Sequence, residues 1–150
     1  MNEISRIQSA LRPHLSWHGA RLSFLALFLV ALFRVETVNL DKLASVFANR
    51  AQSDSNYKRL QRFFRHFVID FDEIARVVVN WSQIPQPWTL SLDRTNWSLG
   101  NTDYNLLFLG IVHEGVAYPV MWTPLDKRGN SNSDERMDLL ERFERLFPDA

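Results

Sequence analysis

Apolar residues recur at helical spacing through the first half of the chain. Their stripes predict helices near residues 4–11, 39–48, 56–67 and 74–81. The clearest stripe is formed by four residues at positions i, i+3, i+4 and i+7, namely Leu60, Phe63, Phe64 and Phe67. A continuous apolar run over 22–33 predicts a further, buried helix, because it is shorter than the roughly 20 residues of a membrane span.

The hydrophobic period changes after the segment Ile84-Pro85-Gln86-Pro87. Alternation of apolar and polar residues over 88–93 predicts a first strand that ends at Asp93. Two further strands are predicted over 106–112 and 116–123, and a final helix follows a cap at Asn132 or Ser133. A meander of three strands and a helix is therefore expected in the second half.

This change of period also suggests the domain organisation. We expect a helical region over residues 1–83, a linker over 84–87 and a β-β-β-α segment over 88–150, so the predicted fold class is α+β. Hydrophobic residues make up 46% of the chain and charged residues 23%, which excludes wholesale disorder. The chain has no cysteine, which excludes disulfides, thiolate metal sites and a cysteine nucleophile.

Charge is distributed unequally, although the formal net charge is zero. Residues 1–69 contain 10 Lys and Arg against 4 Asp and Glu, whereas residues 70–150 contain 7 against 13. A cationic excess in one half is typical of a region that contacts a polyanion. The first half is therefore the better candidate for nucleic-acid binding.

Two of the predicted helices form a candidate DNA-binding unit. A polar turn joins them, and together they are helix-turn-helix-like over about residues 39–67. The polar face of the second helix carries the candidate DNA-binding residues Lys58, Arg59, Arg62 and Arg65. Such side chains can neutralise phosphates and release counterions. The alternative is an amphipathic helix whose charges are simply solvated.

Asp93 is the candidate catalytic and metal-binding residue. A carboxylate on the polar face of a strand can bind Mg²⁺, which prefers oxygen ligands. The alternative is that Asp93 only opens a turn, where aspartate is common. His14 and His18 are four residues apart and could form a metal pair, but Pro13 and Gly19 interrupt a continuous helix there.

Several segments of the chain match a known family. They are the string LSLDRTNW at 90–97, the stretch 105–113, Tyr118-Pro119-Val120 with Trp122, and the loop KRGN at 127–130. Together they resemble the DDE transposases of bacterial insertion sequences, more narrowly the group related to the cut-and-paste elements of composite transposons. Upstream, the stretch from TVNL at 37–40 to YKRLQRFF at 57–64 resembles the N-terminal DNA-binding region of the same family.

The resemblance implies an RNase H-like catalytic domain whose β-β-β-α start is present, with Asp93 as its first catalytic aspartate. In the family, an Asp on a fourth strand and a Glu on a later helix complete a site for two magnesium ions about 4 Å apart. The sequence ends at Ala150, before either acid could occur. We therefore expect the N-terminal portion of a transposase, which binds DNA but is inactive in cleavage and strand transfer as this truncated chain.

The expected partner is double-stranded DNA at transposon terminal repeats, and the DNA complex could contain a homodimer. The expected location is the bacterial cytoplasm, in association with the nucleoid and without membrane contact. Two alternatives remain open. One is a non-catalytic DNA-binding regulator or transposition inhibitor, and the other is a helical interaction module without a nucleic-acid role.

Overall fold

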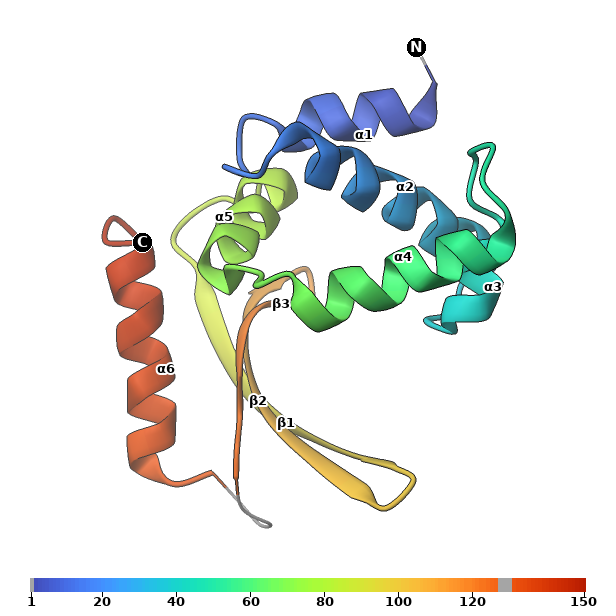
Figure 1. Ribbon diagram of the computed structural model, residues 1–150. Helices are drawn as coiled ribbons and strands as arrows, with labels where there is room; N and C mark the ends of the chain where they lie inside the picture. The colour runs from blue at the N-terminus through green and yellow to red at the C-terminus, as the bar shows by residue number, and fades with distance from the viewer. Residues whose placement is uncertain (1, 127–130) are drawn as a thin grey trace. The chain divides into compact units, whose positions relative to one another are not determined.

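The chain forms two compact units, unit 1 over Met1–Asp70 and unit 2 over Phe71–Ala150. The computed structural model describes residues 2–126 and 131–150, so the KRGN loop quoted above lies outside the described residues. Each unit has its own hydrophobic core. The expected α+β class is confirmed in its order of elements, because helices precede an antiparallel β-β-β-α segment (Figure 1).

Unit 1 is helical. Its described helices are α1 (Glu3–Leu11), α2 (Gly19–Val35), α3 (Leu40–Ser45) and α4 (Ser53–His66). The first three begin directly after a residue whose side chain accepts a backbone N–H, namely Asn2, His18 and Asn39. These caps explain why the helices begin where they do, since they satisfy N–H groups that have no partner within the helix.

The apolar run predicted as a buried helix is α2. Most of its side chains are buried or half-buried, but Phe33 near its C-terminal end is 77% exposed. The core of unit 1 combines side chains of α2, α3 and α4 with one from the loop after α3: Phe24, Leu27, Ala31, Leu43, Ala44, Phe47, Leu60 and Phe63. Among the described helices, none has both the length and the apolar character needed to cross a membrane.

α3 is shorter than the helix predicted near residues 39–48. It ends at Ser45, because Val46 leaves the helical conformation with φ −106° and ψ 6°. Phe47 nevertheless packs into the core and is only 7% exposed. The apolar spacing therefore predicted the burial of Phe47 correctly, but the chain reaches that position through a loop.

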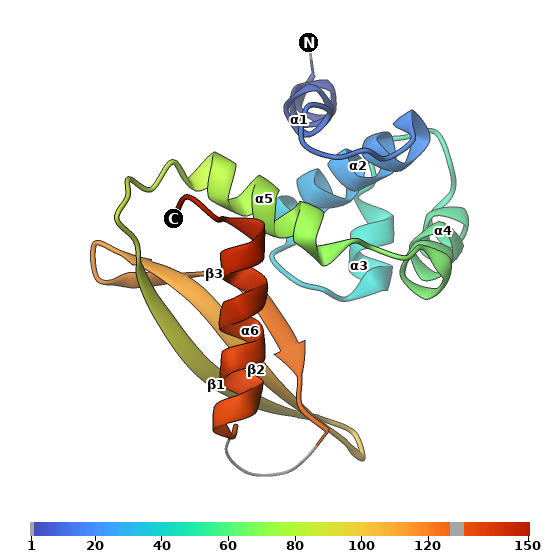
Figure 2. The same ribbon diagram turned by 90° about the vertical axis from the view of Figure 1, so that its left-hand side faces the viewer.

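Unit 2 consists of a helix, a three-stranded sheet and a second helix. The elements are α5 (Phe71–Ser82), β1 (Thr89–Leu99), β2 (Thr102–His113), β3 (Val116–Pro124) and α6 (Ser133–Leu146). The strands are antiparallel in the order β1-β2-β3, and α6 lies along one face of the sheet (Figure 2). α6 begins at a capping box, in which Asn132 and Glu135 each accept the other's backbone N–H.

β1 is longer than the sequence predicted, and this corrects the position of Asp93. The strand continues to Leu99 and turns at Gly100, whose φ is +62°. Asp93 therefore lies within the strand, directly opposite Phe108 of β2, and does not open a turn. Opposite residues of an antiparallel pair share a face, so Asp93 and Phe108 lie on the same side of the sheet.

A bulge interrupts the pairing of β2 with β3. Leu109 pairs with Met121 and Gly110 pairs with Pro119, so Val120 is an extra residue on β3. At the bulge, the backbone of Tyr118 lies close to Gly110. A Cβ at position 110 would lie only 2.9 Å from the Tyr118 carbonyl oxygen. Only glycine fits this position without a shift of the backbone.

α5 groups with the sheet, whereas the sequence placed it in the helical region before a linker at 84–87. The division between the units falls after Asp70. Ala75 of α5 is fully buried in the core of unit 2, and Val78, Val79 and Ile84 pack against the same core. The apolar stripe of α5 indicated a buried face, but it did not indicate which part of the chain covers it.

Candidate nucleic-acid interface

α4 is amphipathic, with a buried face and a cationic face. On the buried face, Leu60 is 0% and Phe63 is 4% exposed. All four predicted DNA-binding residues are exposed, namely Lys58, Arg59, Arg62 and Arg65. Positions 58, 62 and 65 are spaced by one helical turn each, so they form a row, and position 59 lies beside it. The structure therefore brings the predicted residues together on one helix.

A buried asparagine fixes the start of α4 against the preceding turn. Asn56 is 2% exposed, and its side chain exchanges two hydrogen bonds with Asn49, at 2.9 and 3.2 Å. Its amide also donates to the carbonyl oxygens of Ala44 at 3.4 Å and Ala51 at 3.5 Å. Because these partners lie at the end of α3 and in the loop, Asn56 holds α3, the loop and α4 in register.

Asn56→Ala is expected to lower the free energy of unfolding by about 1 kcal/mol, since it removes these hydrogen bonds and leaves the Ala44 carbonyl without its donor. Chemical denaturation followed by far-UV circular dichroism measures the loss. Gln52→Ala is the control, because Gln52 immediately precedes α4 but makes no side-chain capping bond. Equal midpoints for the two variants would contradict the role of Asn56.

An aromatic cluster packs α4 against α2 and the segment before it. The Phe63 ring lies 4.7 Å from that of Phe24 and 5.1 Å from that of Phe67, centroid to centroid. Trp17 meets Phe67 edge-on at 4.7 Å. These contacts give the cationic face of α4 a rigid base, because close-packed rings allow little rotation of the helix.

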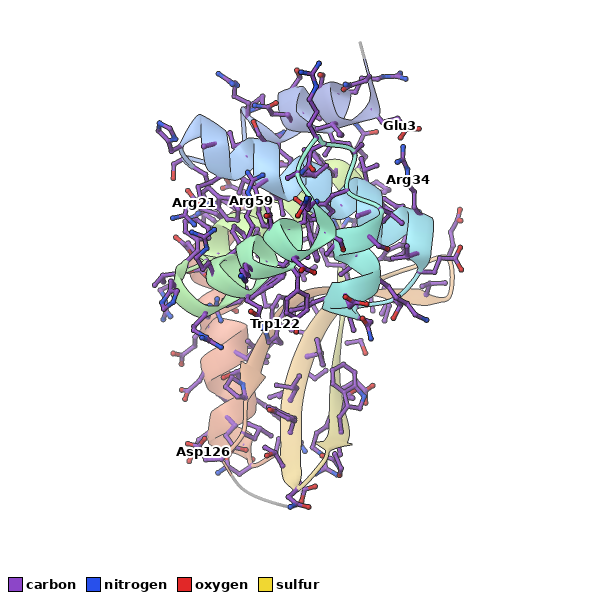
Figure 3. All side chains as sticks on the ribbon, turned by 45° about the vertical axis from the view of Figure 1, so that its right-hand side comes forward. Glu3, Arg21, Arg34, Arg59, Trp122 and Asp126 are labelled. Carbon is purple, nitrogen blue, oxygen red and sulfur yellow. The ribbon has the colours of Figure 1, made fainter. Side chains whose placement is uncertain are left out.

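Two arginines are held against this cluster from outside. The Arg59 guanidinium lies over the Phe24 ring at 4.6 Å, and the Arg21 guanidinium of α2 lies over the Phe67 ring at 4.5 Å. Figure 3 labels both side chains, which lie close together where α2 faces α4. Partial burial and the neighbouring charge of Arg62 lower the pKa of Arg59, but an arginine side chain remains protonated in proteins.

A hollow of about 440 Å³ lies between these two helices. We call it the α2–α4 pocket, and its described lining residues are Ala20, Arg21, Phe24, Arg59, Arg62, Phe63 and His66. Sequence reasoning predicted Arg59 and Arg62 but missed Arg21. Arg21 lies on another, mostly apolar helix, and no local pattern connects it with α4.

Asp93 lies in a different environment. Its side chain is exposed, and one carboxylate oxygen accepts the backbone N–H of Arg94 at 2.8 Å. A cavity of about 310 Å³ beside it is lined by Arg94, Ser131 and Arg136, with Leu92 and Leu107. The polar groups next to Asp93 in this cavity are therefore mainly cationic.

The described residues do not fit a two-ion magnesium site. Over residues 2–126 and 131–150, no group of three or more His, Asp or Glu side chains is close enough to hold a metal ion. Asp93 has no second carboxylate among the residues that line its cavity. Magnesium binding at Asp93 is thus a prediction from the family resemblance alone.

His18 has a structural role that the sequence did not predict. Its Nδ1 atom accepts the backbone N–H of Ala20 at 3.3 Å, so the side chain caps α2. This hydrogen bond occupies Nδ1, one of the two ring nitrogens through which a histidine can bind a metal ion. The presence of a histidine at position 18 is thus explained by its role as the cap of α2.

Comparisons with protein-family models, with curated proteins and with solved structures found no match to this chain. The family resemblance therefore depends on the sequence segments quoted above.

Proposed function

We propose that the chain binds double-stranded DNA through the exposed face of α4, as the terminal-repeat-binding portion of a DDE transposase. The observation that carries the proposal is the row of cations on this face, Lys58, Arg59, Arg62 and Arg65, on a helix fixed by a buried core. Within the described part of the chain, none of the four forms an ion pair with a carboxylate. These charges are therefore available to an external anion.

Electrostatics explains why such a face suits DNA. A duplex presents phosphates at regular intervals, and each phosphate that a side chain neutralises releases condensed counterions. A rigid helix loses little conformational entropy when it binds, so its cations neutralise phosphates at low cost. If this face is merely solvated, removal of one of its cations should leave both the affinity for DNA and its salt dependence unchanged.

Unit 2 supports the family part of the proposal only through its order of elements. Three antiparallel strands followed by a helix agree with the start of an RNase H-like domain. Asp93 lies within β1, on the strand where the resemblance places the first catalytic acid. We propose this domain type for unit 2 and assign no reaction step to it.

Arg62→Ala is expected to reduce the slope of log affinity against log salt concentration by about 1, and to weaken binding to all duplexes alike, if Arg62 contacts a phosphate. Fluorescence anisotropy with labelled duplexes over a range of KCl concentrations measures both quantities. Arg145→Ala is the matched control, because Arg145 is an exposed arginine of α6 in unit 2. Unchanged slope and affinity for Arg62→Ala would refute the assignment of the interface.

The same assay separates the candidate roles. Tighter binding to a terminal repeat of a related insertion sequence than to a shuffled duplex would support an origin as a transposase. Tighter binding to promoter DNA would favour a regulator. Absence of salt-dependent binding to any duplex would instead favour an interaction module.

A further inference from the structure

The α2–α4 pocket concentrates positive charge from two helices. Arg21 comes from α2, whereas Arg59 and Arg62 come from successive turns of α4, and His66 of the next turn also lines the pocket. No acidic side chain is among its described lining residues, and the floor is apolar, formed by Phe24 and Phe63. An apolar floor beneath several cations strengthens their attraction for an anion, because less water screens the charges.

Stacking orients two of the cations. Arg21 lies over Phe67 and Arg59 lies over Phe24, at 4.5 and 4.6 Å from the ring centroids. A guanidinium held over a ring keeps its N–H donors, and these can bind phosphate oxygens in pairs. The two side chains are therefore positioned before any ligand arrives.

The helix start adds to the positive potential. The first turn of α2 contains Arg21 and no acidic residue, although the partial positive charge of a helix N-terminus favours acidic side chains there. Partial burial, and then the charge of Arg62, lower the pKa of Arg59, so a neighbouring anion would stabilise its charged form. A bound anion would relieve both conflicts.

We propose that the α2–α4 pocket binds a phosphate group. For a phosphate of the DNA backbone this inference rests on the proposed function, and free inorganic phosphate is the other source of the same chemistry. A volume of about 440 Å³ admits a phosphate together with the sugar atoms attached to it. Arg21 then extends the interface beyond α4, and two helices hold the same stretch of DNA.

The first arm of the test compares two arginines of α2 in the full chain. Arg21→Gln is expected to weaken binding to duplex DNA about tenfold, since it removes charge-assisted hydrogen bonds. Arg34→Gln is the control. It makes the same change at the other end of α2, about 20 Å along the helix, where Arg34 pairs with Glu3 at 3.0 Å (Figure 3). The control should change affinity less than twofold.

Circular dichroism and thermal melting check that Arg21→Gln folds. If it does not, Arg21→Lys replaces it. This variant keeps the charge but loses the planar fork, and a loss of about threefold is expected. Equal losses for the position 21 variant and for Arg34→Gln would show that the DNA backbone does not occupy the pocket.

The second arm uses inorganic phosphate alone. The ¹⁵N-labelled chain is titrated at constant ionic strength, and saturable shifts are expected at the amides of Ala20 and Arg21 and at the Arg59 Nε–H, but not in Arg21→Gln. Saturable shifts without a DNA effect would assign the pocket to free phosphate. A DNA effect without shifts would assign it to the DNA backbone, and neither effect would overturn the proposal.

The two arms also separate this inference from the proposed function. A wild-type chain that binds no duplex but shows saturable phosphate shifts would refute the proposed function and retain the pocket. If the wild-type chain binds DNA through Arg62, but substitution of Arg21 changes neither the DNA affinity nor the phosphate shifts, the proposed function is supported and phosphate binding in the α2–α4 pocket is refuted.

Discussion

Phe63→Ala is expected to lower the free energy of unfolding of unit 1 by about 3–5 kcal/mol, as for other buried aromatic residues replaced by alanine. Phe63 is 4% exposed and contacts rings on both sides of it in the cluster: Trp17, Phe24, Phe64 and Phe67. The variant loses the burial of a ring and leaves a cavity between α2 and α4. This loss is comparable to the whole stability of a small domain.

Phe64→Ala is the matched control, because Phe64 is the next residue of the same helix but is 48% exposed. Its loss should be clearly smaller than that of Phe63→Ala. Urea denaturation followed by circular dichroism at 222 nm gives the midpoint of each variant. Similar midpoints would show that Phe63 is not a core residue of unit 1.

Gly110→Ala is expected to lower the free energy of unfolding of unit 2 by about 1–3 kcal/mol, the usual range for an added methyl in a packed position. The new Cβ would lie 2.9 Å from the Tyr118 carbonyl oxygen and 3.3 Å from its carbon. Both atoms belong to the backbone, so a side-chain rotation cannot relieve the contact. The bulge at Val120 would have to shift, and the pairing of β2 with β3 would weaken.

Gly19→Ala makes the same chemical change without the conflict, since a Cβ at Gly19 meets no atom within 4 Å. It should leave the stability unchanged or raise it slightly, because alanine favours a helix more than glycine does. Hydrogen exchange of the β2 and β3 amides identifies the weakened region in Gly110→Ala. Unaltered exchange there would contradict the close approach at the bulge.

Side-chain periodicity predicted the order of elements well, because burial of one face is what produces the period. It failed at the ends of elements. β1 continues past Asp93 through Arg94, Thr95 and Asn96, whose side chains carry no apolar alternation. Their backbone pairs with residues Asn105–Leu107 of β2, and such pairing depends on the partner strand rather than on the residues themselves.

The candidate interface was predictable in part for a similar reason. Lys58, Arg62 and Arg65 share a face because helical spacing alone places them together. Arg21 joins them only through the packing of α2 on α4, which local sequence does not encode. The same dependence on tertiary packing explains why the sequence did not indicate that α5 packs in the core of unit 2, since an apolar stripe fits any apolar surface.

The two outer strands of the sheet differ in how far they can accept another strand. Over the described residues the order is β1-β2-β3, so β1 and β3 each have an outer edge. β3 carries Pro119, which has no N–H, and the bulge that twists its edge, whereas the pairing of β1 is regular from Thr89 to Leu99 and contains no proline. A further strand would therefore pair more readily with the edge of β1 than with the edge of β3. An added strand, from this chain or from another copy at high concentration, finds a continuous row of hydrogen-bonding groups along β1 and an interrupted one along β3.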